Sequence, residues 1–126
     1  MINIDDLLGV PYKNHGRNKD GYDCYGLVLE VEKRFGHILP DIDDMKCSEA
    51  LRNFDKLHSE TIKLLNVCEI TEPLQESDVI LFKGTSNTLN HIGVYLGDNN
   101  FIHCNKYGVH IEKLDKWNIG KVYTWQ

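Results

Sequence analysis

The chain has 126 residues, of which 41% are hydrophobic and 26% are charged, and its net charge is −5. This length predicts a single domain over residues 1–126, large enough to bury roughly 60–70% of its unfolded surface without a metal or disulfide. Nucleic acid is not an expected partner, because the acidic chain has no cluster of lysine and arginine to neutralise phosphates.

The amino-terminal residues MINIDDLLGVPYKNHG carry acids where a signal peptide carries basic residues. No window approaches the ~20 apolar residues that span a bilayer. We therefore expect no signal peptide, no membrane span and a cytoplasmic location at synthesis.

Cysteines stand at positions 24, 47, 68 and 104. Without an export signal a reducing compartment is expected, which favours free thiols over two disulfides. The chain lacks a C-x-x-C pair and an H-E-x-x-H motif, so neither a metal nor another cofactor is expected.

Helices are predicted in the first half of the chain. A short helix is expected over Ile4–Leu8, ending before Pro11, followed by a polar loop over residues 13–22. Apolar residues at helical spacing then predict a helix in GYDCYGLVLEVEKRFG, residues 21–36, with Asp23 as N-cap and Gly36 as C′ residue. A further helix is expected over Asp44–Leu57.

In the second half of the chain, apolar and polar residues alternate as they do in β-strands. Strands are predicted at Ile62–Glu69, Ser77–Phe82, His91–Leu96, Asn100–Cys104, Val109–Lys113 and Lys121–Trp125. Early helices and sequential late strands indicate an α+β domain, with amino-terminal helices packed on a five- to six-stranded antiparallel sheet.

Cys24 falls in the first turn of the predicted helix, where free backbone N–H groups and the helix dipole favour a thiolate. A cysteine there can act as a nucleophile near neutral pH. The alternative is a small buried hydrophobic residue, as most free cysteines are.

His91 and His103 are the candidate partners of Cys24, as base and as the group that orients the base. Whether they meet depends on the turn between their strands. A two-residue Asp98-Asn99 loop would separate them, whereas a three-residue loop from Gly97 with a bulge would place both on one face. The active-site hypothesis requires the Cys24 sulfur to face both imidazoles.

Other assignments for the histidines are weaker. Metal ligation by His91, His103 and Cys104 is disfavoured, because Cys104 points to the face opposite His103. The remaining histidines are expected in loops, on a polar helix face or at an outer strand position, and are given no role: His15, His37, His58 and His110.

Five segments together resemble the NlpC family of papain-like cysteine peptidases. In chain order they are GVPY at 9–12, DCYGLV at 23–28, SDVILF at 77–82, NHIGVYLG at 90–97 and FIH at 101–103. The resemblance implies a papain-like fold, with Cys24 as nucleophile, His91 as base and His103 as third member. It also implies cleavage of bacterial cell-wall stem peptides, typically between γ-D-glutamate and a diamino acid, through a thioester.

The same resemblance implies substrate contacts near the nucleophile. Tyr12 would border the cysteine, and Asp23 would help receive a free amine of the substrate, which is compatible with its role as N-cap. Tyr25 replaces the serine that usually follows the cysteine and would alter that substrate subsite.

A lone catalytic domain without a signal resembles phage-tail or prophage-encoded members of the family. Peptidoglycan stem peptides are the expected substrate, and phage tail proteins, with the virion tail as location, are a further expectation. Two alternatives remain open: a non-catalytic tail-assembly or peptide-binding module of the same fold, and an amidase or acyltransferase that uses the same Cys-His pair.

Overall fold

The computed structural model describes residues 2–41, 51, 53–59, 62–65, 73–84 and 88–126. Helix α1 (Cys24–Arg34) begins where the sequence predicts. Asp23 is buried and accepts a hydrogen bond from the backbone N–H of Gly26 at 2.6 Å, which makes it the N-cap. Its carboxylate also lies 2.8 Å from the guanidinium of Arg17. The start of α1 is therefore held by a cap and an ion pair that share one carboxylate oxygen.

The carboxyl end of α1 is a Schellman motif. Gly36 has a φ of 92°, and its N–H donates to the carbonyl of Lys33 at 3.0 Å. The N–H of His37 donates to the carbonyl of Glu32 at 2.8 Å. These two bonds are the ones that define the motif, and the left-handed conformation at its C′ position favours glycine. Both predicted ends of this helix are confirmed.

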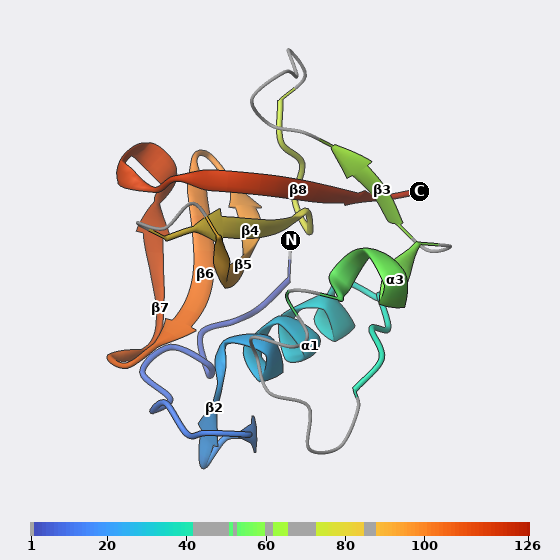
Figure 1. Cartoon of the computed structure of the whole chain (residues 1–126). Coiled ribbons are helices and arrows are strands. Elements are labelled where there is room, and N and C mark those ends of the chain that lie inside the picture. Colours follow the sequence, from blue (N-terminus) through green and yellow to red (C-terminus); the bar gives the residue numbers. More distant parts are fainter. Residues whose placement is uncertain (1, 42–50, 52, 60–61, 66–72, 85–87) are drawn as a thin grey trace.

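Six strands form one sheet in the order β3-β8-β4-β5-β6-β7, and every neighbouring pair is antiparallel (Figure 1). The strands are β3 (Ile62–Leu65), β4 (Val79–Lys83), β5 (Leu89–Gly97), β6 (Asn100–Asn105), β7 (Gly108–Lys113) and β8 (Ile119–Trp125). The sheet confirms the predicted α+β class. A 3₁₀ turn, Leu114–Lys116, connects β7 to β8.

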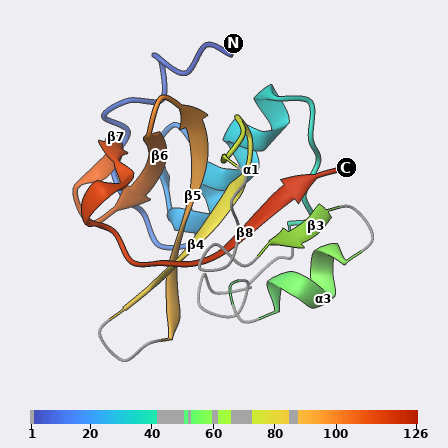
Figure 2. The same cartoon turned by 90° about the horizontal axis from the view of Figure 1, so that it is seen from above.

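The two faces of the sheet bury different clusters. Helix α1 packs on one face, which is visible beneath β4 and β5 in Figure 2. Side chains on this helix face include Val28 and Val31 of α1 with Ile92, Val94 and Ile102 of the sheet. A second cluster contains Ile80, Phe82, Phe101, Leu114 and Val122, against which Trp117 packs. Because side chains alternate along a strand, residues adjacent to Ile92 and Ile102 point to this second face.

Three predicted elements differ in the structure. Residues 5–9 form turns, so the helix predicted over Ile4–Leu8 is wrong. Helix nucleation is costly for so short a segment. The segment is fixed by pairing with β7 instead: the N–H of Gly9 donates to the carbonyl of Val109, and the N–H of Val109 donates to the carbonyl of Val10.

The loop predicted over residues 13–22 contains the two-residue strands β1 (Arg17–Asn18) and β2 (Gly21–Tyr22). Helix α3 (Phe54–His58) overlaps the carboxyl end of the helix predicted over Asp44–Leu57 and runs one residue past it, and residues 44–50 and 52 of that range lie outside the described residues. Among the described residues there is no helix with the length and apolar character needed to cross a bilayer.

Glu32 is a fully buried carboxyl group on the inner side of α1. Its Oε1 lies 3.1 Å from Nδ1 of His37, whose ring stacks on Trp125. Burial raises the pKa of Glu32 from 4.5 to about 8, because an ionised carboxylate loses its hydration there. The folded chain therefore holds a proton that the unfolded chain releases between these two pH values.

This bound proton predicts a pH dependence of stability. The folded-state pKa of Glu32 lies above its unfolded value, so its contribution is fully present below about pH 4.5 and is lost as the pH rises toward 8. Glu32→Gln keeps the shape and removes the titration, and it should raise the free energy of unfolding more at pH 8 than at pH 5. Urea unfolding of both proteins at the two pH values measures this. An equal effect of the substitution at both would contradict it.

The shared carboxylate of Asp23 gives a second prediction. Asp23→Ala removes the cap and leaves Arg17 without this partner, so it should lower the free energy of unfolding by about 1–3 kcal/mol. Asp23→Asn is the matched control, since its amide oxygen can still cap the helix and only the charge is lost. In urea unfolding, the asparagine variant should lose less stability than the alanine variant. Equal losses would assign the whole effect to the ion pair.

Candidate active site

The turn between β5 and β6 decides where the two histidines point. Asp98 and Asn99, with φ values of 52° and 66°, form a two-residue turn, and Gly97 pairs with Asn100. The register then shifts by one residue, because Tyr95 pairs with Phe101 and Leu96 is left out of the pairing. The structure thus has the short loop that was expected to separate the histidines, and a bulge at Leu96 that reverses its effect.

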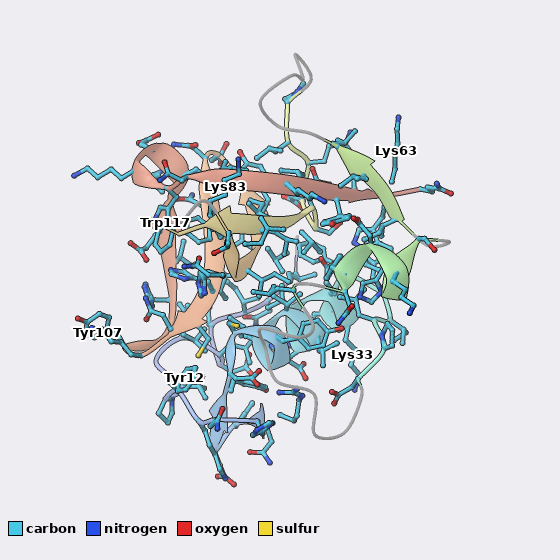
Figure 3. The ribbon with its side chains drawn as sticks, in the orientation of Figure 1. Tyr12, Lys33, Lys63, Lys83, Tyr107 and Trp117 are labelled. Carbon is cyan, nitrogen blue, oxygen red and sulfur yellow. The ribbon has the colours of Figure 1, made fainter. Side chains whose placement is uncertain are left out.

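After this bulge His91 and His103 share the second face of the sheet. Nε2 of His91 lies 2.6 Å from Nδ1 of His103, and the two rings meet edge-on. Trp117, which Figure 3 places on the connection between β7 and β8, packs against both rings. Burial, together with the charge that His103 would carry, lowers the pKa of His91 to about 4. His91 is therefore neutral at pH 7.

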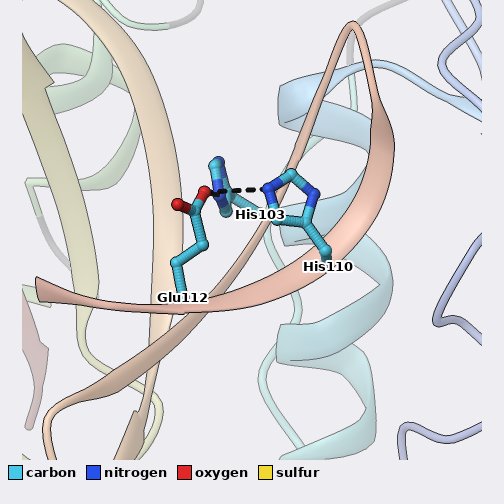
Figure 4. A group of neighbouring side chains, drawn as sticks. All are labelled: His103, His110 and Glu112. Carbon is cyan, nitrogen blue, oxygen red and sulfur yellow. Dashed lines mark hydrogen bonds and ion pairs between the residues drawn. The ribbon is translucent and has the colours of Figure 1, made fainter.

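Glu112 of β7 completes the arrangement. Its Oε2 lies 2.5 Å from Nε2 of His103 and 2.8 Å from Nε2 of His110 (Figure 4). Although burial opposes it, the contacts with the His103 and His110 rings lower the pKa of Glu112, so this carboxylate is ionised. Sequence reasoning did not find Glu112 and placed His110 at an outer strand position. In the structure His110 pairs directly with His103 across β6 and β7, with its ring on the same face.

A signal for these two residues was present in the sequence. The segment from His103 to Glu112 reads HCNKYGVHIE, and a two-residue turn at Lys106-Tyr107 places His103 opposite His110. Because side chains alternate between the two faces of a strand, Glu112, two residues after His110, lies on the same face. Applying the hairpin argument to β6 and β7 as well as to β5 and β6 would have identified both side chains.

The hydrogen bonds define which ring nitrogens carry protons. An ionised Glu112 can only accept, so Nε2–H of His103 donates to it. Nδ1 of His103 must then accept, and Nε2–H of His91 donates to that nitrogen. This leaves a lone pair on Nδ1 of His91, which is the form that a general base requires.

Cys24 is the first residue of α1 and is 7% exposed. It belongs to the cluster on the helix face of the sheet, with Ile92 and Ile102. The rings of His91 and His103 contact residues of the second face, so the structure joins the two histidines, and Cys24 heads the helix that packs against β5 and β6.

The cysteines differ in redox state. Cys24 is disulfide-bonded, which corrects the expectation of free thiols for this residue. Cys104 is free and buried on the helix face, where its sulfur donates to the carbonyl of Tyr22 at 3.2 Å, and burial raises its pKa to about 11. Cys47 and Cys68 lie outside the described residues.

The three predicted substrate-binding residues surround the start of α1. Tyr12 is 43% exposed and pairs with Tyr22, and it lies on the amino-terminal segment in Figure 3. The carboxylate of Asp23 is engaged by Gly26 and Arg17, as described above. Tyr25 is fully buried and its hydroxyl donates to the carbonyl of Pro40 at 2.7 Å, so in this structure it is a core residue directly after Cys24.

The fold resembles solved domains at low sequence identity. The NlpC/p60 domain of the peptidoglycan hydrolase SagA superposes with a TM-score of 0.62 at 18% identity, over 94% of this chain and 89% of that one. NlpC2 of Trichomonas vaginalis superposes with a TM-score of 0.68 at 20% identity, over 96% of this chain and 45% of that one. These likenesses concern the fold alone.

Curated proteins match at higher identity. The murein DD-endopeptidase MepS/murein LD-carboxypeptidase of Escherichia coli K12 is 29% identical over 118 residues, which are 92% of this chain and 54% of that protein. The probable endopeptidase Rv2190c of Mycobacterium tuberculosis is 28% identical over 116 residues, 92% of this chain and 25% of that protein. The chain thus spans between a quarter and about half of the length of these relatives.

The model of the NlpC/P60 family matches residues 9–125, nearly the whole chain. This match includes the helix start, the histidine pair and Glu112. The chain therefore belongs to the NlpC/P60 family.

Proposed function

We propose that this domain is a cysteine peptidase that hydrolyses bacterial cell-wall stem peptides, with Cys24 as nucleophile, His91 as base and His103 as orienting residue. Family membership and the relatives named endopeptidases support the activity class. The single structural observation that carries the proposal is the hydrogen-bonded chain from Glu112 through His103 to His91. It fixes a neutral imidazole with a lone pair on Nδ1.

The proposed reaction is acyl transfer through a thioester. Nδ1 of His91 takes the proton of the Cys24 thiol, and the thiolate attacks the amide carbonyl of the substrate. Backbone N–H groups at the start of α1 stabilise the oxyanion. His91 then protonates the leaving amine, and water hydrolyses the thioester to release the carboxylic acid and regenerate the thiol.

This mechanism sets two requirements on Cys24. A disulfide-bonded sulfur has no thiolate, so the active protein must be reduced. The sulfur must also approach Nδ1 of His91 to within about 2.6–3.2 Å, the range of a hydrogen bond that transfers a proton.

The proposed bond is the one between γ-D-glutamate and a diamino acid. The free amine of the substrate would be received beside Asp23, whose carboxylate is buried and paired with Arg17. Substrate would enter past the exposed ring of Tyr12. A role as a component of a phage tail or prophage is part of the same proposal.

A second candidate function is a non-catalytic peptide-binding or tail-assembly module. The disulfide at Cys24 favours this candidate, because a disulfide-bonded sulfur is not a nucleophile. Analysis of digested wall fragments by mass spectrometry distinguishes it from a peptidase, because a binding module releases no product. The mass of the products also distinguishes peptide cleavage from amidase or acyltransferase chemistry.

The nucleophile is tested by substitution under reducing conditions. With the protein reduced by a phosphine, Cys24→Ala should lower hydrolysis of wall peptides by at least about 10³-fold, because alanine has no thiol with which to form the proposed thioester. Cys104→Ala is the matched control, since it removes a buried thiol outside the proposed chemistry, and it should keep most of the activity. Full activity of the Cys24 variant would refute the proposed role.

The base is tested by its titration. His91 should titrate near pH 4 and stay neutral from pH 5 to 8, with the proton on Nε2. Long-range ¹⁵N–¹H correlation spectra link each ring nitrogen to the protons on the ring carbons. They report both the midpoint of the His91 titration and its tautomer. A His91 midpoint between pH 6 and 7 would contradict the buried hydrogen-bonded pair.

A further inference from the structure

Three side chains on the second face of the sheet converge on one point. Nε2 of His103, Nε2 of His110 and a carboxylate oxygen of Glu112 all lie within 4.8 Å of one another (Figure 4). They come from neighbouring positions of β6 and β7, so the antiparallel pairing holds their backbones in place. Two imidazoles and one carboxylate are the ligand set of many zinc sites that keep one coordination position open.

The hydrogen bond between Nδ1 of His110 and the backbone of Gly108 determines which ring nitrogen of His110 has a free lone pair. Its Nδ1 lies 3.0 Å from the carbonyl oxygen of Gly108, which can only accept, so Nδ1 carries a proton. In neutral His110 the lone pair is then on Nε2, and it faces the carboxylate oxygen of Glu112 at 2.8 Å. Two lone pairs at this distance repel each other unless a proton or a metal cation lies between them.

The other two ligands are also supported from outside the cluster. His103 is fully buried, and its Nδ1 lies against Nε2 of His91, so its ring orientation is fixed. Metal-binding histidines characteristically make such a bond with the nitrogen that does not bind the metal. The side chains of His110 and Glu112 are 33% and 38% exposed, which gives an ion a path from solvent.

The cluster must open slightly to accept an ion. Zinc ligands at about 2.0–2.1 Å in tetrahedral geometry are roughly 3.3 Å apart. The two contacts of Glu112, at 2.5 and 2.8 Å, are shorter than this. Rotation of the half-exposed Glu112 side chain supplies the difference without moving either strand.

We propose that His103, His110 and Glu112 bind a divalent transition-metal ion of the zinc class, and that the bound ion turns off the base at His91. The second half rests on the proposed peptidase function. With metal on Nε2 of His103, its proton moves to Nδ1, which then donates to Nε2 of His91. His91 must accept there and carry its own proton on Nδ1, so it has no lone pair for the Cys24 thiol.

Metal binding is tested first, on the tag-free full chain kept reduced by a phosphine that does not chelate zinc. Titration with Zn²⁺ should give one site per chain with a micromolar or lower dissociation constant. His110→Asn should weaken binding at least 10-fold, and the matched control His15→Asn, at an exposed histidine, should leave it unchanged. Equal affinity of wild type and His110→Asn would overturn the site.

Two further measurements guard against misinterpretation. Co²⁺ bound by two nitrogens and an oxygen lacks the intense near-ultraviolet band of a thiolate ligand, so a strong band would overturn the proposed ligand set. Glu112→Gln, at a half-exposed position, provides a second variant if His110→Asn does not fold, and it should also weaken Zn²⁺ binding at least 10-fold. Unchanged affinity in a folded Glu112→Gln would likewise overturn the site.

The effect on the base has its own readout. On adding one equivalent of Zn²⁺, the ¹⁵N spectrum of His91 should change from the Nε2–H to the Nδ1–H tautomer, and wall-peptide hydrolysis should fall at least 10-fold. In His110→Asn, the Zn²⁺ concentration for half-inhibition, relative to the variant's own metal-free activity, should rise at least 10-fold. Zinc binding without the tautomer change would overturn the regulatory half. A chain inactive without zinc would refute the peptidase instead, and the binding and tautomer results would still stand.

Discussion

One unpaired residue, Leu96, determines the arrangement of polar groups in this protein. The two-residue turn at Asp98-Asn99 alone would send His91 and His103 to opposite faces, because a shift of one residue reverses the face of every side chain on a strand. The bulge at Leu96 restores the alignment and brings the imidazoles into contact at 2.6 Å. The β6–β7 pairing then adds Glu112 to the same face, so a hydrogen-bonded chain crosses three strands.

This hydrogen-bonded chain of side chains explains how the half-buried His91 can be both neutral and oriented. Burial lowers the pKa of His91 to about 4, which removes the charged form at neutral pH. The hydrogen bond to His103 then selects the tautomer, and the carboxylate of Glu112 fixes that choice from the far end. Phe82 and Trp117 pack against the His91 ring, and such partly apolar surroundings make polar contacts stronger than they would be in solution.

The helix face obeys a different constraint. The start of α1 is fixed by Asp23, which caps the helix and pairs with Arg17, while Gly26 admits the close approach of the Gly16 carbonyl. Cys24 is thereby held at the start of α1, in a disulfide. The histidine chain is assembled independently of the cysteine, so the proposed chemistry depends on the redox state and position of one residue.

The sequence by itself determined the elements whose causes are local. The cap at Asp23, the C′ glycine at position 36 and the apolar stripe between them specify α1, and alternation specifies most of the sheet strands. The ordered motifs around Cys24, His91 and His103 also indicated the family, which the match over residues 9–125 shows. The turns at residues 5–9 were missed because pairing with β7, rather than local propensity, fixes that segment.

Only the tertiary structure decided which of these residues meet. The bulge at Leu96 has no signature in composition or spacing, since both loop lengths fit the same residues and only packing selects between them. The partnership of His110 and Glu112 with His103 depends likewise on how the strands pair. Sequence patterns encode the face of a side chain within its own element, whereas contacts between elements follow from register and layering, which are properties of the whole fold.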